Sequence, residues 1–248
     1  MSTVAVIQAR MGSTRLPGKI MRPIRGATVL GHVLTRVRAC PQLDAVVVAT
    51  TTNPADDQVA AESRAHGARV FRGSELDVLD RYYHAAKENQ AAAVVRITSD
   101  CPLFDPHLLT RMIDEFHSLG ATGRKVDYLS NTLQRTFPRG LDVEIFTFAA
   151  LERAHREAAQ PHEREHVTPY IHQHPELFCL RNFAGPEDLS HHRWTLDTED
   201  DLRFVEAVYA ALHREGELFS TEDVLRLLAE RPDLALLNAH VEQKKLGQ

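Results

Sequence analysis

The first 120 residues alternate between two hydrophobic patterns. Short apolar runs rich in β-branched residues, such as residues 3–8 and 44–51, are typical of strands buried on both faces of a parallel sheet. Elsewhere apolar residues recur every three or four positions, as at Val29, Val33 and Val37, which predicts a helix. By the same criteria, strands are predicted over 68–73 and 92–100, and helices over 55–67, 74–90 and 105–120. This rhythm predicts an α/β fold with a mostly parallel sheet and helices on both faces.

The regular alternation of predicted strands and helices ends near residue 125. Strands are predicted over 125–131, 141–148, 177–184 and 193–198, and helices over 149–160, 199–216 and 220–232. Residues 161–175 between them are polar and rich in histidine. We interpret residues 125–190 as a small inserted subdomain within a single domain that covers residues 1–248.

Composition narrows the class of protein. The 248 residues are 43% apolar, enough to bury a full core, and the formal charge of −5 argues against a protein that coats nucleic acid or an anionic membrane. No apolar run approaches 18 residues, so we expect neither a signal peptide nor a membrane span. Three widely spaced cysteines are typical of reduced thiols. We therefore expect a cytoplasmic protein.

The loop after the first predicted strand, residues 9–19 (ARMGSTRLPGK), is the most informative segment. It is not a Walker phosphate loop. That motif needs four residues between its glycines and a hydroxyl after its lysine, whereas five residues separate Gly12 and Gly18, and Ile20 follows Lys19. The glycine pattern of a dinucleotide-binding fold is absent as well.

The same loop nevertheless suits a polyphosphate. It lies at the carboxyl end of the first strand, where open α/β sheets bind ligands. It carries three cations, Arg10, Arg15 and Lys19, and its backbone at Gly12 and Ser13 can approach an anion closely. Three cations are suited to neutralising a triphosphate before a nucleophile attacks phosphorus. A solvated basic loop is the alternative interpretation.

Two carboxylates stand at the ends of later predicted strands. Asp100 closes "VVRITSD" and Asp197 closes "RWTLD". Hard oxygen ligands at strand ends are what a magnesium–triphosphate site requires. The alternative for Asp197 is a helix N-cap, because an acidic helix start follows it.

Residues 162–166, HEREH, match the H-E-x-x-H zinc-hydrolase motif, and His172 falls where a third ligand would lie. Residue 169, however, is proline where the longer signature needs a glycine to turn the chain. We therefore keep a zinc hydrolase only as a remote alternative.

The opening motif R-x-x-S-T-R-L-P-G-K at 10–19 resembles the cytidylyltransferases that make CMP-activated sugars. These include the 3-deoxy-manno-octulosonate (KDO) and acylneuraminate enzymes and, most similar, the spore-coat polysaccharide biosynthesis cytidylyltransferase-like proteins. The resemblance continues in order through "RGSELDVLDRYYHAA", "VVRITSDCPL", "FPRGLDVEIF", "EREHVTPYI" and "RWTLDTEDDL". It covers nearly the whole chain, and it implies the Rossmann-like nucleotide-diphosphate-sugar transferase fold.

The resemblance also implies roles for single residues. It places Mg²⁺ on Asp100 and Asp197, with catalysis by Arg10, Lys19 and Asp100. Expected nucleotide contacts are Ala9, Arg10, Gly12, Ser13, Arg15, Lys19, Arg72, Thr98 and Ser99. From their side-chain chemistry, and not from the resemblance, we expect acceptor contacts at Arg139, Asp142, Glu144, Glu165 and His166; surface polar residues are the alternative. The KDO enzymes have a glutamine that helps to read cytosine where this chain has Thr98 and Ser99. Selectivity for cytosine would then rest on backbone groups, Arg72 and these hydroxyls.

We therefore expect a magnesium-dependent nucleotidyltransferase that transfers CMP from CTP to an acidic or modified sugar for surface polysaccharide biosynthesis. By resemblance it is a homodimer through residues 125–190, and the His-rich stretch lines the acceptor pocket or the dimer contact. Three alternatives stay open. These are a transferase of the same fold with another base or a non-sugar acceptor, a glycosyltransferase that uses a preformed nucleotide-sugar, and a nucleotide-binding protein without turnover.

Overall fold

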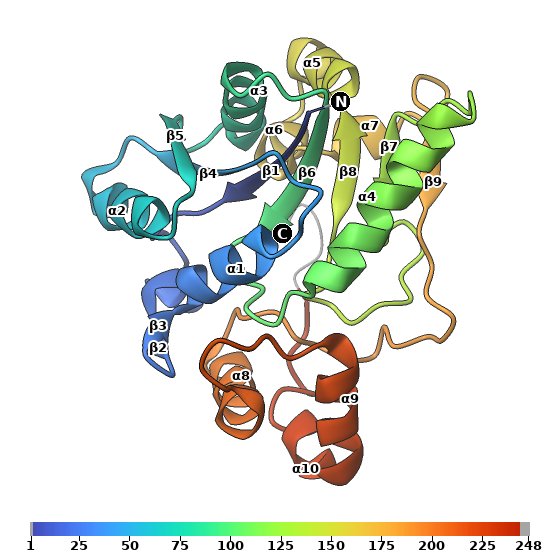
Figure 1. Cartoon of the computed structure of the whole chain (residues 1–248). Helices are drawn as coiled ribbons and strands as arrows, with labels where there is room; N and C mark the ends of the chain where they lie inside the picture. Colours follow the sequence, from blue (N-terminus) through green and yellow to red (C-terminus); the bar gives the residue numbers. More distant parts are fainter. Residues whose placement is uncertain (1, 244–248) are drawn as a thin grey trace.

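The computed structural model, which describes residues 2–243, is built on a seven-stranded sheet in the order β5-β4-β1-β6-β8-β7-β9 (Figure 1). Neighbouring strands run parallel except at β8, which is antiparallel to both β6 and β7. The strands are β1 Thr3–Gln8, β4 Ala45–Thr51, β5 Arg69–Gly73, β6 Ala93–Thr98, β7 Tyr128–Ser130, β8 Glu144–Thr147 and β9 Leu180–Asn182. The predicted mostly parallel α/β fold is confirmed.

Helices connect these strands and extend beyond them. They are α1 Val29–Arg38, α2 Asp57–Ala65, α3 Val78–Glu88, α4 Pro106–Ala121, α5 Phe148–Glu157, α6 Pro161–His166, α7 Pro169–His172, α8 Glu199–Leu212, α9 Thr221–Glu230 and α10 Pro232–Ala235. Two short 3₁₀ turns, η1 Lys19–Met21 and η2 Pro54–Asp56, and a hairpin of β2 Pro23–Ile24 with β3 Ala27–Thr28 complete the described chain. No helix within residues 2–243 combines the length and the apolar character needed to span a bilayer.

The sheet has a hydrophobic core on each face because side chains alternate along a strand. On β1, Ala5 and Ile7 pack in the cluster that includes residues of α1, α4 and α8. Val4 and Val6 point the other way, into the cluster formed by residues of α3 and α5. Helices therefore cover both faces, as the continuous apolar runs of the central strands predict.

Residues 125–190 add strands to this same sheet, since β7, β8 and β9 continue it beyond β6. The polar segment 161–175 contains two short helices that its composition did not predict. Proline stands at the first position of both α6 and α7, where its missing N–H costs nothing. The assignment of 125–190 to a dimer contact stays a prediction.

The strand predicted over 193–198 is wrong. The segment is extended, but its only β-type pairing within the described chain is an isolated bridge between Arg193 and Arg139. Its backbone bonds go to loops instead: Trp194 N donates to Arg139 O (2.7 Å) and Leu196 N donates to Asp100 O (2.9 Å). The segment is apolar because it is buried, and its sequence therefore resembles that of a strand. In the structure it passes the end of β6 without joining the sheet.

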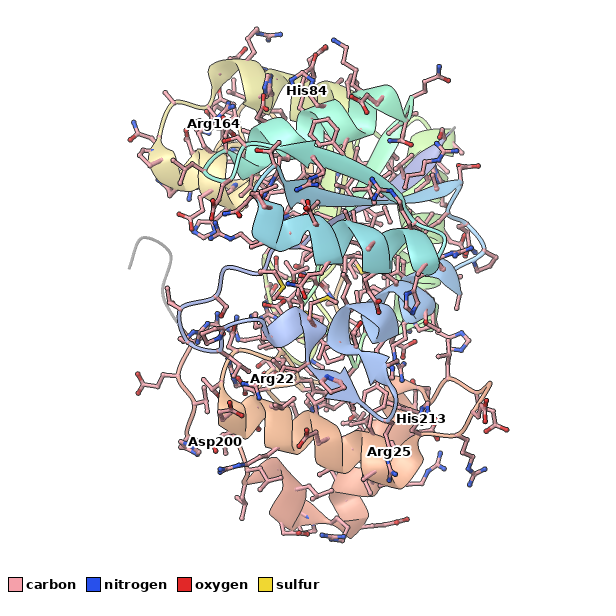
Figure 2. The ribbon with its side chains drawn as sticks, turned by 90° about the vertical axis from the view of Figure 1, so that its left-hand side faces the viewer. Arg22, Arg25, His84, Arg164, Asp200 and His213 are labelled. Carbon is pink, nitrogen blue, oxygen red and sulfur yellow. The ribbon has the colours of Figure 1, made fainter. Side chains whose placement is uncertain are left out.

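The C-terminal helices α8, α9 and α10 pack together beside the lower end of the sheet in Figure 1. The β2–β3 hairpin lies next to α8, and Figure 2 shows Arg22 and Arg25 at this border. Arg22 Nη2 contacts Glu199 Oε1 at 3.0 Å, and Arg25 Nη2 donates to Ala210 O at 3.0 Å. Within the core, the buried Arg36 guanidinium donates to Phe104 O (3.1 Å) and Phe219 O (2.9 Å). These bonds fix the C-terminal helices to the sheet domain.

Candidate functional site

The loop that follows β1 is closed by its own backbone. Gly18 adopts φ +67°, a left-handed conformation that favours glycine, and its N–H donates to Met11 O at 3.3 Å. Met11 N in turn donates to Asp56 Oδ1 at 2.7 Å, which ties the loop to the end of β4 through η2. The closed loop leads directly into η1, whose first residue is Lys19.

Lys19 joins three distant parts of the sequence. Its ammonium donates to Asp100 Oδ2 (2.6 Å), to Asp197 Oδ1 (2.8 Å) and to Leu196 O (2.8 Å). Asp100 lies just beyond β6, and Asp197 lies just before α8. The structure thus brings together the lysine of the first loop and both predicted metal ligands, at the carboxyl ends of β1 and β6.

Burial and charge oppose each other at this cluster. Burial lowers the pKa of the Lys19 ammonium, but the two carboxylates outweigh it and raise the pKa above its ordinary value. Burial likewise raises the pKa of Asp100, and Lys19 outweighs it, so the pKa of Asp100 lies below its ordinary value. Both groups are therefore charged at neutral pH, and the carboxylates hold a cation between them.

Asp197 is bound by two further cations. Arg15 Nη2 lies 2.9 Å from Oδ1, and Arg193 Nη2 lies 3.0 Å from Oδ2. The helix-cap alternative for Asp197 does not hold, because the N-cap of α8 is Thr198. Asp197 is free of that role and faces the basic loop.

Sequence reasoning missed the group that positions this aspartate. The carboxylate of Asp201 is fully buried and accepts from Arg193 Nε (2.8 Å), from Asn238 Nδ2 (2.9 Å) and from the backbone N–H of Asp197 (2.9 Å). Asp201 lies in the first turn of α8. The available signal was the T-x-x-D spacing of Thr198 and Asp201, which is a capping-box pattern.

The donor set of this cluster fits a magnesium ion. Asp100 Oδ2 and Asp197 Oδ1 are hard oxygen atoms that already share one cation. Both side chains are largely buried, with 23% and 10% of their surfaces exposed, so a replacement cation would still be partly shielded from water. Mg²⁺ binds proteins through one or two carboxylates and completes its shell with water and phosphate.

Other predicted nucleotide contacts surround the same loop. Arg10 lies 3.4 Å from Glu75 in an exposed ion pair, and the Ser13 hydroxyl accepts from Leu16 N at 3.3 Å. Ala9 is buried and its N–H donates to Ala49 O, whereas Gly12 is exposed. Only Arg15 and Lys19 of the predicted loop contacts touch the carboxylates directly.

The predicted base contacts are partly engaged elsewhere. Arg72 uses all three guanidinium nitrogens on the β4–α2 connection: Nε donates to Thr51 O (2.8 Å), Nη2 to Asn53 O (2.9 Å) and Nη1 to Asp57 (2.5 Å). The Thr98 hydroxyl contacts Cys101 Sγ at 3.3 Å, and Ser99 is buried beside it. Arg72 therefore anchors a loop in this structure.

A cavity of about 610 Å³ is lined in part by Arg193, the residue that pairs with Asp197. Its lining includes Arg139, Arg193, Phe204, Leu225, Leu228 and Leu236. Arg139 is half-buried and its guanidinium has no partner within residues 2–243; burial and neighbouring arginines lower its pKa. Trp194 also lines the cavity, and its indole N–H is buried without a hydrogen-bond partner among the described residues. Asp142 does not line this cavity, and its carboxylate accepts from Nη1 (2.5 Å) and Nη2 (2.8 Å) of Arg135.

The remaining predicted acceptor contacts are not brought to this cavity. Glu144 is buried, pairs with the Arg96 guanidinium and accepts from Tyr128 Oη at 2.8 Å. Glu165 is exposed on α6, and His166 ends that helix. A contact between Glu144 and an acceptor would require the pair with Arg96 to break.

The zinc motif is explained by local structure. Glu163, which would be the catalytic base, accepts from the N–H groups of Ala159 (2.9 Å) and Gln160 (2.8 Å) and caps α6. Within the described chain, His162 and His166 belong to no group of three potential metal ligands. The carboxylate is used to start a helix, which argues against the hydrolase alternative.

Three comparisons with known proteins all match this chain to cytidylyltransferases or their relatives. A family model described as cytidylyltransferase matches residues 4–233. The spore coat polysaccharide biosynthesis protein SpsF of Bacillus subtilis is 34% identical over 237 residues, which span 93% of this chain and 95% of SpsF. The solved structure of a cytidylyltransferase from Leptospira borgpetersenii superimposes with a TM-score of 0.89 at 37% identity, covering 99% of both chains. A CMP-KDO synthetase complexed with CTP shares the fold alone, with a TM-score of 0.64 at 19% identity over 85% of this chain and 99% of that one.

Proposed function

Because this chain belongs to the cytidylyltransferase family, we propose that it transfers CMP from CTP to a hydroxyl group of an acidic or modified sugar and releases pyrophosphate. It is a nucleotidyltransferase. The cluster of Lys19 with Asp100 and Asp197 is the observation that carries the proposal, because it places a cation and two hard anions at the strand ends where this fold binds ligands.

In the proposed complex, the triphosphate lies over the loop of residues 9–19. Arg15 and Lys19 exchange their carboxylate partners for phosphate oxygens, and Arg10 leaves its exposed pair with Glu75. Asp100 and Asp197 would hold Mg²⁺, which when bound supplies positive charge to the phosphates. These residues position the α-phosphorus and neutralise charge for in-line attack, as in other phosphoryl-type transfers.

We place the acceptor in the cavity lined by Arg139 and Arg193. Arg193 lines that cavity and also contacts Asp197, so a sugar bound there would stand next to the proposed metal ligands. The guanidinium of Arg139, which has no partner within residues 2–243, suits a carboxylate. The apolar wall formed by Phe204, Leu225, Leu228 and Leu236 would accommodate deoxy or acylated positions of the sugar.

The first test is thermal stabilisation by CTP, UTP, ATP and GTP, each with and without Mg²⁺. A ligand that binds only the folded state adds about 2.7 kcal/mol at a hundred times its dissociation constant, so a substrate stands out. We expect a magnesium-dependent shift with CTP. Pyrophosphate release from CTP on addition of sugar acids then distinguishes this reaction from glycosyl transfer. Binding without pyrophosphate release from any acceptor would instead favour the non-catalytic alternative.

Replacing Arg139 by alanine should weaken acceptor binding selectively. A hydrogen bond to a charged group is worth about 1.5–3 kcal/mol, so KM for a sugar acid should rise roughly ten- to a hundredfold. KM for CTP should stay the same, because Arg139 does not touch the lysine–aspartate cluster. The exposed Arg181 on β9 is the matched control. Equal changes in both KM values would remove Arg139 from the acceptor site.

A further inference from the structure

A group of three potential metal ligands lies outside the candidate site. Asp80 and His84 stand four residues apart on α3, so both side chains lie on one face of that helix. His155 joins them from α5. One carboxylate oxygen and two imidazole nitrogens, all within 4.8 Å of one another, form the group. Two nitrogen donors and one carboxylate are a ligand set typical of Zn²⁺.

This group lies on the opposite face of the sheet from α8, the helix that follows Asp197. Buried residues of α3 and α5 pack in one cluster, whereas those of α8 pack in the cluster on the other face. Figure 2 shows His84 and Arg164 in the upper part of the molecule and Asp200 in the lower part. A metal ion bound here would therefore be distinct from the Mg²⁺ proposed at Asp100 and Asp197.

The spacing of the three ligand atoms suits a tetrahedral ion. Asp80 Oδ1 lies 2.9 Å from His155 Nε2 and 3.3 Å from His84 Nε2. Around Zn²⁺, with bonds of about 2.0–2.1 Å, ligand atoms at tetrahedral angles are about 3.3 Å apart. Small side-chain movements would therefore admit the ion. Each imidazole would then carry its proton on Nδ1 and offer the lone pair of Nε2 to the metal.

Packing already fixes α5 to α3 around this group. The His155 ring stacks on Tyr83 of α3, with centroids 4.1 Å apart and an angle of 11° between the planes. Arg164 provides a second link. Its Nη2 donates to Asp77 Oδ2 (2.5 Å), just before α3, and its Nη1 donates to His155 O (2.8 Å) on α5. The two helices therefore present their ligands from fixed positions, which reduces the ordering that a bound ion would require.

We propose that Asp80, His84 and His155 bind one Zn²⁺ ion, which cross-links α3 to α5. All three residues are partly exposed, so the ion enters from solvent and a water molecule completes its shell. Imidazole nitrogens favour Zn²⁺ over Mg²⁺, which prefers oxygen ligands. The ion stabilises the packing of these helices, and its binding does not depend on the proposed function.

The test is calorimetric titration of metal-free protein with Zn²⁺, in a reducing buffer that contains excess Mg²⁺ to occupy carboxylate sites. We expect wild type to bind one Zn²⁺ per chain. His84→Gln and His155→Gln should each bind Zn²⁺ at least about a hundredfold more weakly, because loss of an outer partner alone costs about ten- to a hundredfold in affinity. His162→Gln is the matched control: this histidine belongs to no such group within residues 2–243, so its replacement should leave the affinity unchanged.

Two further measurements identify the ligands. Co²⁺ in place of Zn²⁺ should give the visible absorption of a tetrahedral ion in wild type, and His84→Gln should lose it. Zn²⁺ should raise the melting temperature of wild type and of His162→Gln but not that of His84→Gln. Because the His84 side chain is 44% exposed, this variant should fold without metal.

Three results would overturn the zinc site. These are a wild type that binds no Zn²⁺, equal affinity in wild type and both ligand variants, and a charge-transfer band from cysteine thiolate to Co²⁺, which would place the ion elsewhere. None of these measurements includes a nucleotide, so any of the three results would leave the proposed function intact.

Discussion

Replacing Lys19 by alanine is expected to lower kcat by about three orders of magnitude. Its ammonium contacts both Asp100 and Asp197. In the proposed complex it moves its charge onto the triphosphate, where bond breaking increases the negative charge. Without it, the phosphates lose a donor that is already held at the reaction centre. Steady-state pyrophosphate release with saturating CTP and Mg²⁺ measures the effect.

Two measurements distinguish this loss from simple misfolding. The variant leaves two carboxylates without their shared cation, so Mg²⁺ alone should raise its melting temperature more than that of wild type. Lys87→Ala, an exposed lysine on α3, is the control and should retain normal turnover. Near-normal activity in Lys19→Ala would remove this residue from the reaction and with it the central observation of the proposed function.

Of the substitutions proposed for this protein, Arg96→Met should lower the free energy of unfolding most. Arg96 on β6 is paired with Glu144 on the neighbouring strand β8, and both side chains are mostly buried. Burial raises the pKa of Glu144, but Arg96 outweighs it and lowers the pKa below its ordinary value, so the carboxylate is charged at pH 7. Removing the arginine leaves the buried carboxylate of Glu144 without a partner, which lowers the free energy of unfolding by about 3–5 kcal/mol. Thermal unfolding at pH 7 should show a fall of about 10 °C.

A second substitution makes the physical reason testable. Arg96→Met combined with Glu144→Met removes both charges, and because paired replacement of a buried ion pair is often neutral, most of the lost stability should return. The exposed pair of Arg231 with Asp233 is the matched control, and Arg231→Met should change the melting temperature little. If the double variant is no more stable than Arg96→Met, the loss arises from packing and not from an unpaired charge.

The sheet could be predicted from the sequence because its central strands are continuous apolar runs and its helices carry clear caps. Both signals depend only on residues that are close in the sequence. β1, β4 and β6 each bury nearly every residue, and α8 begins with the Thr198–Asp201 capping box. The strand predicted over residues 193–198 was wrong because its structure depends on contacts that are distant in the sequence. Those residues are buried like a strand, but their backbone partners lie in distant loops, which hydrophobicity does not encode.

Some residues of the candidate site could be predicted from local sequence, and others could not. Lys19 and Asp100 could be placed together because they follow β1 and β6, which are neighbouring parallel strands whose carboxyl ends meet. Asp197 joins them although the segment that carries it is not a strand. The contact of Asn238 with Asp201 could not be predicted, since the two residues lie 37 positions apart in the chain and no local pattern links them. The pair of Glu144 with Arg96 could not be predicted either, because the two residues lie 48 positions apart in the chain. The role of Glu144 as an acceptor contact stays a prediction.

The bond between Asn238 and Asp201 has a consequence for local unfolding. Asn238 follows α10 and donates both to Asp201 and to Arg193 O (2.9 Å), so the last described turns of the chain hold the segment that carries Asp197. Fraying of α9 and α10 would therefore release Asp197 while the seven-stranded sheet stays intact. Heat inactivation would then precede global melting. Amide hydrogens near Asp197 would exchange with the C-terminal helices and not with β1, so the least stable part of the chain would set the temperature limit of turnover.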